Sequence, residues 1–291
     1  MFPVAVRTRN RPAYCDVMLK SLMASALPPD FRPPVVIDDC SDDPVAKRYV
    51  ETDDVIDLPV PLMWQKSPEW LAHVGRIRNV RRVRGIRSKF EVVRPDSRKG
   101  ERGGAFWSVC FLFERFPDAQ AAFLFEDDIV FHPGWLAATM RAYEGCRDKH
   151  GPNGSRIGLL TAYDRRNGSG ATPGTGWGWR SLRSHGDGRW GCGDGIGGVF
   201  YLISRQLYEE NRDALKEPHD PSGRGGDTRL QGMCANRKFN IAVTAPSYCQ
   251  HIGDVSLAWA GKGWRHTKNF LKPFAFEKFD DKGEAYSDDW L

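Results

Sequence analysis

The sequence predicts an α/β protein in which helices flank a mostly parallel, Rossmann-like central sheet. Three observations predict this class. The N-terminal region alternates an apolar strand, a helix and a second apolar strand, and a third apolar run further along ends, like the second, in consecutive acids. The chain of 291 residues is also 41% hydrophobic, which is enough to build the core of a large domain. We therefore expect one domain over residues 1–291.

The first three predicted elements form a strand–helix–strand unit. Residues 3–7 are a short β-type run, residues 12–26 carry apolar side chains near one helical face, and the pair Pro28-Pro29 ends that helix. Residues 34–39 then form a continuous apolar run that ends in two carboxylates. Continuous apolar strands of this kind are typical of a parallel sheet that is buried on both faces.

The next two elements repeat this pattern. Residues 105–116 place phenylalanine and valine at helical spacing, and residues 121–125 form an apolar strand that runs into Glu126-Asp127-Asp128. The carboxyl ends of parallel strands meet at one edge of a sheet, and open α/β sheets bind their ligands there. We therefore expect the acids that follow both strands to lie together at that edge.

The second half of the chain has a different composition. Residues 151–198 hold 15 of the 30 glycines, interleaved with tryptophans, and no periodicity is visible before the apolar strand at 199–203. The glycine-rich run at 193–198 leads into that strand and not into a helix, which argues against a dinucleotide-binding fingerprint. Long loops of this composition are usually functional or mobile. We expect one domain whose two halves, residues 1–132 and 133–291, differ in task.

The run Glu126-Asp127-Asp128 is the strongest indication of chemistry. Three carboxylates inside an apolar strand are costly to desolvate unless they face a cation or water at the strand end. Apolar residues resume directly after Asp128, which favours the cation. Oxygen ligands suit Mg²⁺ or Mn²⁺, ions that bridge carboxylates to the phosphates of a substrate.

The acids after the second strand allow two interpretations. Ser41 or Asp42 is a good N-cap for a helix over residues 44–50, which is a purely structural role. A carboxylate such as Asp39 at the carboxyl end of a strand also accepts hydrogen bonds from a base or a ribose. The residues alone leave both open.

Together these motifs resemble nucleotide-sugar-dependent glycosyltransferases of the GT-A fold. Residues 4–12 are similar to that fold's first strand and turn, residues 35–42 to its second strand, and residues 126–128 to an E-D-D form of its D-x-D motif. The resemblance implies that residues 1–132 bind the nucleotide-sugar, expected to be a UDP-sugar, and that residues 133–291 form the acceptor and catalytic half. It also implies Mn²⁺, or Mg²⁺, as the cofactor.

The resemblance further assigns roles to individual residues. It implies that Asp39 binds uracil or ribose, that Asp128 contacts the metal ion, and that Glu126 and Asp127 serve the nucleotide. In this family a glycine-headed helix precedes the motif strand, and Arg102-Gly103-Gly104 matches its start. The residues expected to bind the donor are Thr8, Arg9, Asn10, Arg11, Asp39, Arg102, Gly104, Glu126 and Asp127.

Three residues of the second half complete the expected site. Asp227 follows a glycine pair at the start of a short predicted helix, and inverting members of the family place their catalytic base at such a position. An ordinary helix N-cap is the structural alternative, and Asp194 is the competing candidate for the base. His251 opens a His-Ile-Gly run that resembles the one whose histidine completes the metal shell, so we expect it to bind the metal with Asp128, an N/O ligand set that suits Mn²⁺.

Positive charge is concentrated in one segment. The net charge is +5, yet Arg76–Arg102 holds eleven basic and three acidic residues and so carries +8. Three interpretations stay open: a solvated face, a groove that binds DNA or RNA, or a clamp on the donor diphosphate through Lys99 or Arg102.

The expected function is therefore a metal-dependent, inverting glycosyltransferase that acts on an acceptor hydroxyl. The acceptor is a modified nucleic-acid base, a polysaccharide or a small molecule. The alternative is a nucleic-acid-binding protein on the same scaffold without transferase activity. A phosphohydrolase is disfavoured because the acids lack the paired histidines that are common in two-metal sites.

The sequence also predicts the compartment. The apolar stretch at the N-terminus is too short for a secretory signal, and no apolar run approaches the ~20 residues of a membrane span. The seven cysteines are scattered and never spaced C-x-x-C, which argues against a disulfide framework or a zinc site. We expect a cytoplasmic protein without membrane insertion.

Overall fold

A computed structural model describes residues 2–42 (except 24, 26, 29, 30 and 33), 90–131, 134–148, 156–163, 178–181, 199–219, 225–237, 239–245 and 248–251. In chain order the elements are β1 (Val4–Thr8), α1 (Pro12–Met23), β2 (Val35–Asp38), β3 (Glu91–Val93), α4 (Gly100–Arg115), β4 (Ala121–Glu126), β5 (Ile129–Phe131), α5 (Trp135–Asp148), β6 (Arg156–Thr161), β7 (Gly178–Ser181), β8 (Phe200–Ser204), α6 (Arg205–Glu210), α7 (Arg212–Lys216), α8 (Gly226–Asn236), β9 (Phe239–Ala245) and β10 (Cys249–His251).

Strands from both halves of the chain form one sheet. Its order is β3-β2-β1-β4-β8-β6-β9-β7, and β10 pairs with β5 in a separate ribbon. The first four strands are parallel to one another, β8 is antiparallel to both of its neighbours, β6 and β9 are parallel, and β7 is antiparallel to β9. The predicted α/β class with a mixed, mostly parallel sheet is confirmed, whereas the single domain over residues 1–291 and its division into two halves stay predictions.

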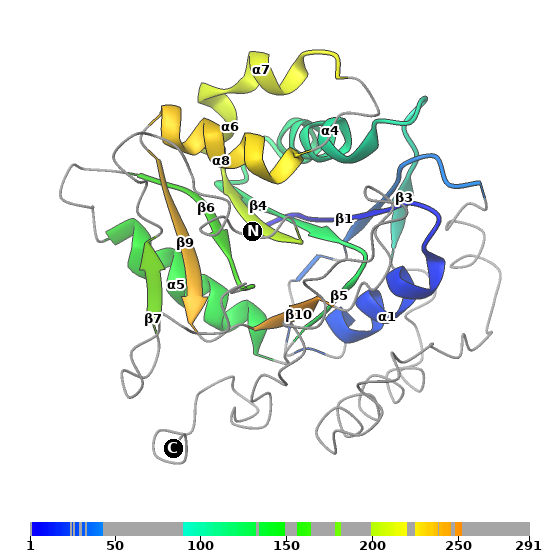
Figure 1. Cartoon of the computed structure of the whole chain (residues 1–291). Helices are drawn as coiled ribbons and strands as arrows, with labels where there is room; N and C mark the ends of the chain where they lie inside the picture. Colours follow the sequence, from blue (N-terminus) through cyan, green and yellow to red (C-terminus); the bar gives the residue numbers. More distant parts are fainter. Residues whose placement is uncertain are drawn as a thin grey trace.

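Helices cover both faces of this sheet, with α1 and α5 on one side and α4, α6 and α8 on the other (Figure 1). This layering explains why the strands are apolar without alternation: Phe123 and Phe125 of β4 pack on the α1 side, while Leu124 packs against α4. On the α1 side, Trp135 is fully buried and lies 5.3 Å from the ring of Phe123 and 4.9 Å from that of Phe131.

Two sequence-based expectations about elements were wrong. Helix α4 begins at Gly100, five residues before the predicted start, because the carboxylate of Asp39 caps its N-terminus. The segment 151–198 contains β6 and β7, although no periodicity was visible there. Gly158 interrupts the apolar run of β6, and a Cβ there would lie 2.8 Å from Cys234 Sγ. The expected helix over residues 44–50 lies outside the described residues.

Within the part of the chain that the structure describes, none of the helices combines the length and the apolar character that crossing a bilayer requires.

Candidate active site at the carboxyl edge of the sheet

The carboxyl ends of β1, β2 and β4 lie next to one another. Thr8, the last residue of β1, pairs with Asp38 of β2, and Arg7 pairs with Glu126 of β4. The Asp39 N–H donates to the Thr8 carbonyl at 2.9 Å. The acids that follow the second and third apolar runs therefore meet at one edge of the sheet, as the sequence predicts.

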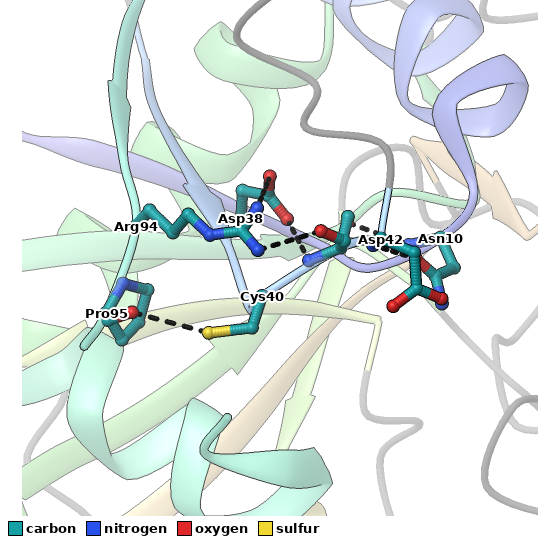
Figure 2. Close-up of polar contacts among 7 residues, drawn as sticks. Asn10, Asp38, Cys40, Asp42, Arg94 and Pro95 are labelled. Atoms are coloured by element: carbon teal, nitrogen blue, oxygen red, sulfur yellow. Dashed lines mark hydrogen bonds and ion pairs between the residues drawn. The ribbon is translucent and has the colours of Figure 1, made fainter. Parts of the chain in front are cut away.

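The turns after β1 and β2 are joined by side chains (Figure 2). Asn10 Nδ2 donates to Asp42 Oδ2 at 2.9 Å, and the Asp42 N–H donates back to Asn10 Oδ1 at 2.8 Å. On the other side of the β2 turn, Arg94 Nη1 donates to Asp38 Oδ2 at 3.2 Å. Asn10, which the sequence assigns to the nucleotide, thus helps to fix the edge itself.

The turn after β2 has an unusual backbone conformation at Cys40. Its φ is 58°, in the left-handed region that non-glycine residues rarely adopt. The Cys40 N–H donates to the Asp38 carbonyl at 2.7 Å, and its Sγ donates to the Pro95 carbonyl at 3.3 Å (Figure 2). These contacts hold a strained residue directly beside Asp39, a placement common at functional sites.

Asp39 has a structural partner already. Its Oδ1 accepts from the Lys99 N–H at 2.6 Å and its Oδ2 from the Gly100 N–H at 2.9 Å. The carboxylate therefore caps helix α4 and lies where the positive end of the helix dipole favours an anion. Each oxygen retains a second acceptor site, so the predicted contact with uracil or ribose stays compatible with this role.

On the α1 side of the edge, four residues form what we call the Arg11 cluster: Thr8, Arg11, Asp127 and Asp128. The Arg11 guanidinium donates through Nη2 to Asp127 Oδ1 and through Nη1 to Asp128 Oδ2, the latter at 2.6 Å. Thr8 Oγ1 donates to Asp127 Oδ2 at 2.7 Å. The side chain of Asp127 is fully buried and that of Asp128 is 7% exposed. Both oxygens of Asp127 are therefore engaged by protein groups.

On the opposite side of the sheet, beneath α4 and α8, five residues form the Glu101 cluster: Arg7, Glu101, Glu126, Tyr201 and Asp227. Arg7 Nη1 lies 3.2 Å from Glu126 Oε1. A Cβ at Gly104 would lie 3.3 Å from Arg7 Nη2, so this predicted site glycine leaves room for the guanidinium. Glu126 ends β4 and lies in this cluster, whereas Asp127 and Asp128 lie in the turn that follows and contact Arg11, so the E-D-D motif is divided between the two clusters.

Helix α8 brings Asp227 into this cluster through a close contact with α4. Gly225 has φ 80° and donates its N–H to Glu101 Oε1 at 3.3 Å. A Cβ at Gly226 would lie 3.3 Å from the Glu101 carbonyl oxygen, so glycine permits the approach. Asp227 is half-buried in the first turn of α8, where its Oδ1 accepts from the Thr228 N–H at 2.7 Å.

Two acids of the Glu101 cluster, Glu126 and Glu101, have raised pKa values. Burial raises the pKa of Glu126 to about 7, Arg7 opposes the shift, and the charges of Asp128 and Asp127 add to it. Burial also raises the pKa of Glu101. The hydrogen bond from the Gly225 N–H opposes this shift, and the charge of Asp227 adds to it.

The Tyr201 hydroxyl lies in the same electrostatic environment. Burial raises its pKa well above the ordinary value, and the charges of Asp227 and Glu126 add to the shift. Among the described residues, neither Tyr201 OH nor Glu101 Oε2 has a hydrogen-bond partner.

The Arg11 cluster has a different electrostatic balance. Burial disfavours the charged form of Arg11, yet the charges of Asp127, Asp128 and Glu126 outweigh it and raise the Arg11 pKa. Burial raises the pKa of Asp127 to about 6, with Arg11 opposing the shift and Asp128 adding to it. The guanidinium is therefore held firmly in its charged form between two carboxylates.

The backbone of His251 lies beside the E-D-D motif. His251 ends β10 and pairs in register with Ile129, the residue that follows Asp128. Among the side chains that the structure describes, no three histidines, cysteines or acids are grouped as metal ligands.

The remaining residues that the sequence predicts for the site lie outside the two clusters or outside the described residues. Arg102 lies in the first turn of α4 with Nη2 3.3 Å from His219 Nδ1, and Arg9 is half-buried. Asp194 and the basic residues from 76 to 89 lie outside the described residues. The nucleic-acid contact through Arg76–Arg102 therefore stays a sequence-based prediction.

Sequence reasoning missed three residues of the Glu101 cluster. The sequence did contain a signal for Arg7, because a charged residue in an apolar strand requires a partner of opposite charge. Glu101 is one of three acids within a basic segment, and Tyr201 is part of an apolar strand, so neither residue stands out in the sequence. Their roles depend on strand register and on the contact between α4 and α8.

Similarity to known proteins lies in the fold. No family model and no curated protein matches the sequence. Among solved structures, TarS 1–349 of S. aureus in complex with UDP-GlcNAc aligns with a TM-score of 0.50 at 14% identity, covering 88% of this chain and 61% of TarS. GalNAc-T7 with UDP, GalNAc and Mn²⁺ gives 0.49 at 13% identity, covering 90% and 44%. The mannosyltransferase PcManGT of Pyrobaculum calidifontis with GDP-Man and Mn²⁺ gives 0.46 at 13%, covering 85% and 58%.

The chain thus spans less than two thirds of each of these proteins. Its strand order and the alignment with TarS agree with the resemblance drawn from residues 4–12, 35–42 and 126–128. The protein has the fold of the GT-A glycosyltransferases.

Proposed function

We propose that this protein is a metal-dependent, inverting glycosyltransferase that moves a sugar from a nucleotide-sugar to an acceptor hydroxyl. The meeting of three strand ends carries the proposal, because it gathers residues 8–11, Asp39 and the E-D-D motif at one edge of a GT-A sheet. TarS 1–349, which aligns with this fold, was solved in complex with UDP-GlcNAc. We therefore assign a UDP-sugar as the donor.

The acids at this edge support the proposal of a divalent cation. The carboxylates of Asp127 and Asp128 already bind one cationic group, the guanidinium of Arg11. The backbone of His251 lies in register beside Ile129. Asp128 and His251 would hold Mn²⁺, for which mixed oxygen and nitrogen ligands are suitable. When bound, the ion stabilises the departing nucleoside diphosphate.

The base in this proposal is Asp227. A carboxylate in the first turn of a helix is stabilised by the helix dipole, and the α4 contact fixes the start of α8 through Gly225 and Gly226. Its half-buried position leaves part of the side chain accessible to an acceptor hydroxyl. Asp227 takes the proton of that hydroxyl as it attacks the sugar, a role that depends first on reach.

The donor assignment is tested by ligand-induced stabilisation. UDP is expected to raise the melting temperature in the presence of Mn²⁺ and much less in its absence, because a ligand that binds only the native state stabilises it. GDP serves as the matched nucleotide. Absence of any shift with either nucleotide, with and without Mn²⁺, would overturn the proposed function.

The metal assignment is tested by two substitutions. Asp128→Asn and His251→Ala are each expected to lower Mn²⁺-dependent turnover of a UDP-sugar by about 100-fold. Asp118→Asn is the control, because Asp118 is an exposed acid in the turn before β4. Wild-type turnover in both site variants would show that these two residues do not hold the ion.

A further inference from the structure

Arg11 is the cationic side chain that contacts two of the three acids of the E-D-D motif. Its guanidinium bridges Asp127 and Asp128, and its own side chain is only 16% exposed. Charge-assisted hydrogen bonds of this kind are among the strongest in proteins, and removal from water strengthens them further. The carboxylate expected to bind the metal thus already has a cationic partner.

The two contacts of Arg11 differ in how firmly they are fixed. Asp127 is fully buried, and its second oxygen accepts from Thr8 at 2.7 Å. Asp128 lies in the turn between β4 and β5, retains slight exposure, and precedes the residue that pairs with His251. The contact with Asp127 is therefore the more deeply buried of the two, and the contact with Asp128 is the more accessible.

We propose that Arg11 competes with the divalent cation for Asp128. In the metal-free protein Arg11 holds the Asp128 carboxylate, and metal binding separates that pair while Arg11 stays bound to Asp127. This inference rests on the metal assignment made above. It adds that Arg11, which the sequence placed among the donor-binding residues, sets the affinity of the site for metal.

The competition follows from charge and geometry. A guanidinium and a divalent ion that approach the same carboxylate repel each other, and the low polarity of a buried site increases that repulsion. The motif offers three carboxylates to two arginines, because Arg7 pairs with Glu126 and Arg11 with the other two acids. The motif and its two arginines therefore sum to one negative charge, and Asp128 presents that charge to the ion only when Arg11 releases it.

The test measures Mn²⁺ binding to nucleotide-free protein, by the electron paramagnetic resonance signal of unbound Mn²⁺. Arg11→Gln is expected to tighten Mn²⁺ binding by about tenfold or more, within the range of coupling measured for close charge pairs. Arg94→Gln is the matched control, because it removes one positive charge from the same edge and leaves the E-D-D motif intact. It is expected to change Mn²⁺ affinity by less than about threefold, since Arg94 is 43% exposed and screened.

A second variant keeps the test decisive if Arg11→Gln does not fold. Arg11→Lys retains the charge as a compact ammonium on a shorter side chain, without the planar fork that spans both carboxylates. It is expected to stay on the buried Asp127 and to leave Asp128 to the metal, so Mn²⁺ binding tightens here as well. Unchanged or weaker Mn²⁺ affinity in the folded variants overturns the competition.

The outcomes separate this inference from the proposed function. Binding of UDP and Mn²⁺ to the wild type, without tighter Mn²⁺ binding in either Arg11 variant, contradicts the competition and leaves the proposed function intact. Turnover of a UDP-sugar by a protein that binds no Mn²⁺ in any form contradicts the metal assignment and the competition together.

Discussion

The two faces of the sheet at its carboxyl edge neutralise their acids in different ways. In the Arg11 cluster, two carboxylates share one guanidinium and a threonine hydroxyl. In the Glu101 cluster, three carboxyl groups accompany a single Arg7, and burial raises the pKa of both Glu126 and Glu101. The Arg11 cluster thus has one guanidinium for two carboxyl groups, whereas the Glu101 cluster has one for three.

This difference suggests a division of tasks between the faces. A permanent guanidinium suits a site that exchanges cations and meets a diphosphate, because its charge does not change with pH. Carboxyl groups with raised pKa values suit a site that accepts a proton. The division depends on where β4 ends, because Glu126 is its last residue and Asp127 and Asp128 lie in the turn that follows.

The largest effect is expected from Asp227→Asn in the Glu101 cluster. An amide cannot take the acceptor's proton, so transfer is expected to fall by roughly 10²–10⁴-fold while donor affinity is unchanged. Steady-state release of UDP, together with calorimetric titration of UDP, measures both quantities. Asp213→Asn removes an exposed acid from the first turn of α7 and serves as the control. A transfer rate within threefold of the wild type would exclude Asp227 as the base.

A matched pair of amide substitutions compares the two faces in stability. Asp127→Asn leaves the Arg11 guanidinium buried with one ion pair fewer, and is expected to lower the free energy of unfolding by about 3–5 kcal/mol at pH 8. Glu101→Gln keeps an acceptor for the Gly225 N–H and removes a carboxyl group whose pKa burial raises, so it is expected to cost less than about 1 kcal/mol. Urea unfolding at pH 8 measures both. Equal losses would contradict the contrast between the faces.

A third effect concerns the dependence of stability on pH. The pKa of Glu126 is about 7 in the folded protein against an ordinary value of 4.5, so the native state holds more protons than the unfolded state between these values. Stability is then expected to fall as pH rises from about 4.5 to 7, by at most about 3 kcal/mol from this group.

Asp127 and Glu101 add to the fall in the same direction, because their pKa values are also raised. Glu126→Gln is expected to flatten the curve over this range, which urea midpoints at pH 5, 6 and 7.5 measure. A wild-type stability that rises with pH would show that Glu126 is ionised by its pair with Arg7.

Much of the fold was predictable from continuous apolar runs. Residues 34–39 and 121–125 identified buried parallel strands, and the acids at their ends located the edge where the clusters form. Register was not predictable, and it decides that Arg7 meets Glu126 and that His251 lies beside Ile129. A three-residue strand such as β10 carries no periodicity of its own.

Long-range polar contacts account for what the sequence did not show. Helix α4 starts at Gly100 because Asp39, 61 residues earlier, supplies the cap. The Glu101 cluster likewise joins five segments of the chain, and Glu101 itself lies in a segment that is basic by composition, so its grouping with Glu126 and Asp227 was not visible in the sequence. Local patterns predict elements and edges, whereas the pairing of charges across the edge requires the assembled sheet.

The smallest expected effect is the change in the free energy of unfolding when the Tyr201 hydroxyl is removed. Tyr201 and Tyr208 are both buried tyrosines whose hydroxyls have no hydrogen-bond partner among the described residues. A buried hydroxyl without a partner carries a desolvation cost, so Tyr201→Phe and Tyr208→Phe are each expected to raise the free energy of unfolding by about 0.5–1 kcal/mol. Tyr208 lies on α6, outside the Glu101 cluster, and is the matched control. Urea unfolding measures both variants. A loss of stability in Tyr201→Phe alone would show that this hydroxyl hydrogen-bonds to the acids through water. Hydrogen bonds from Tyr201 would then stabilise the acids of the Glu101 cluster in addition to their protonation.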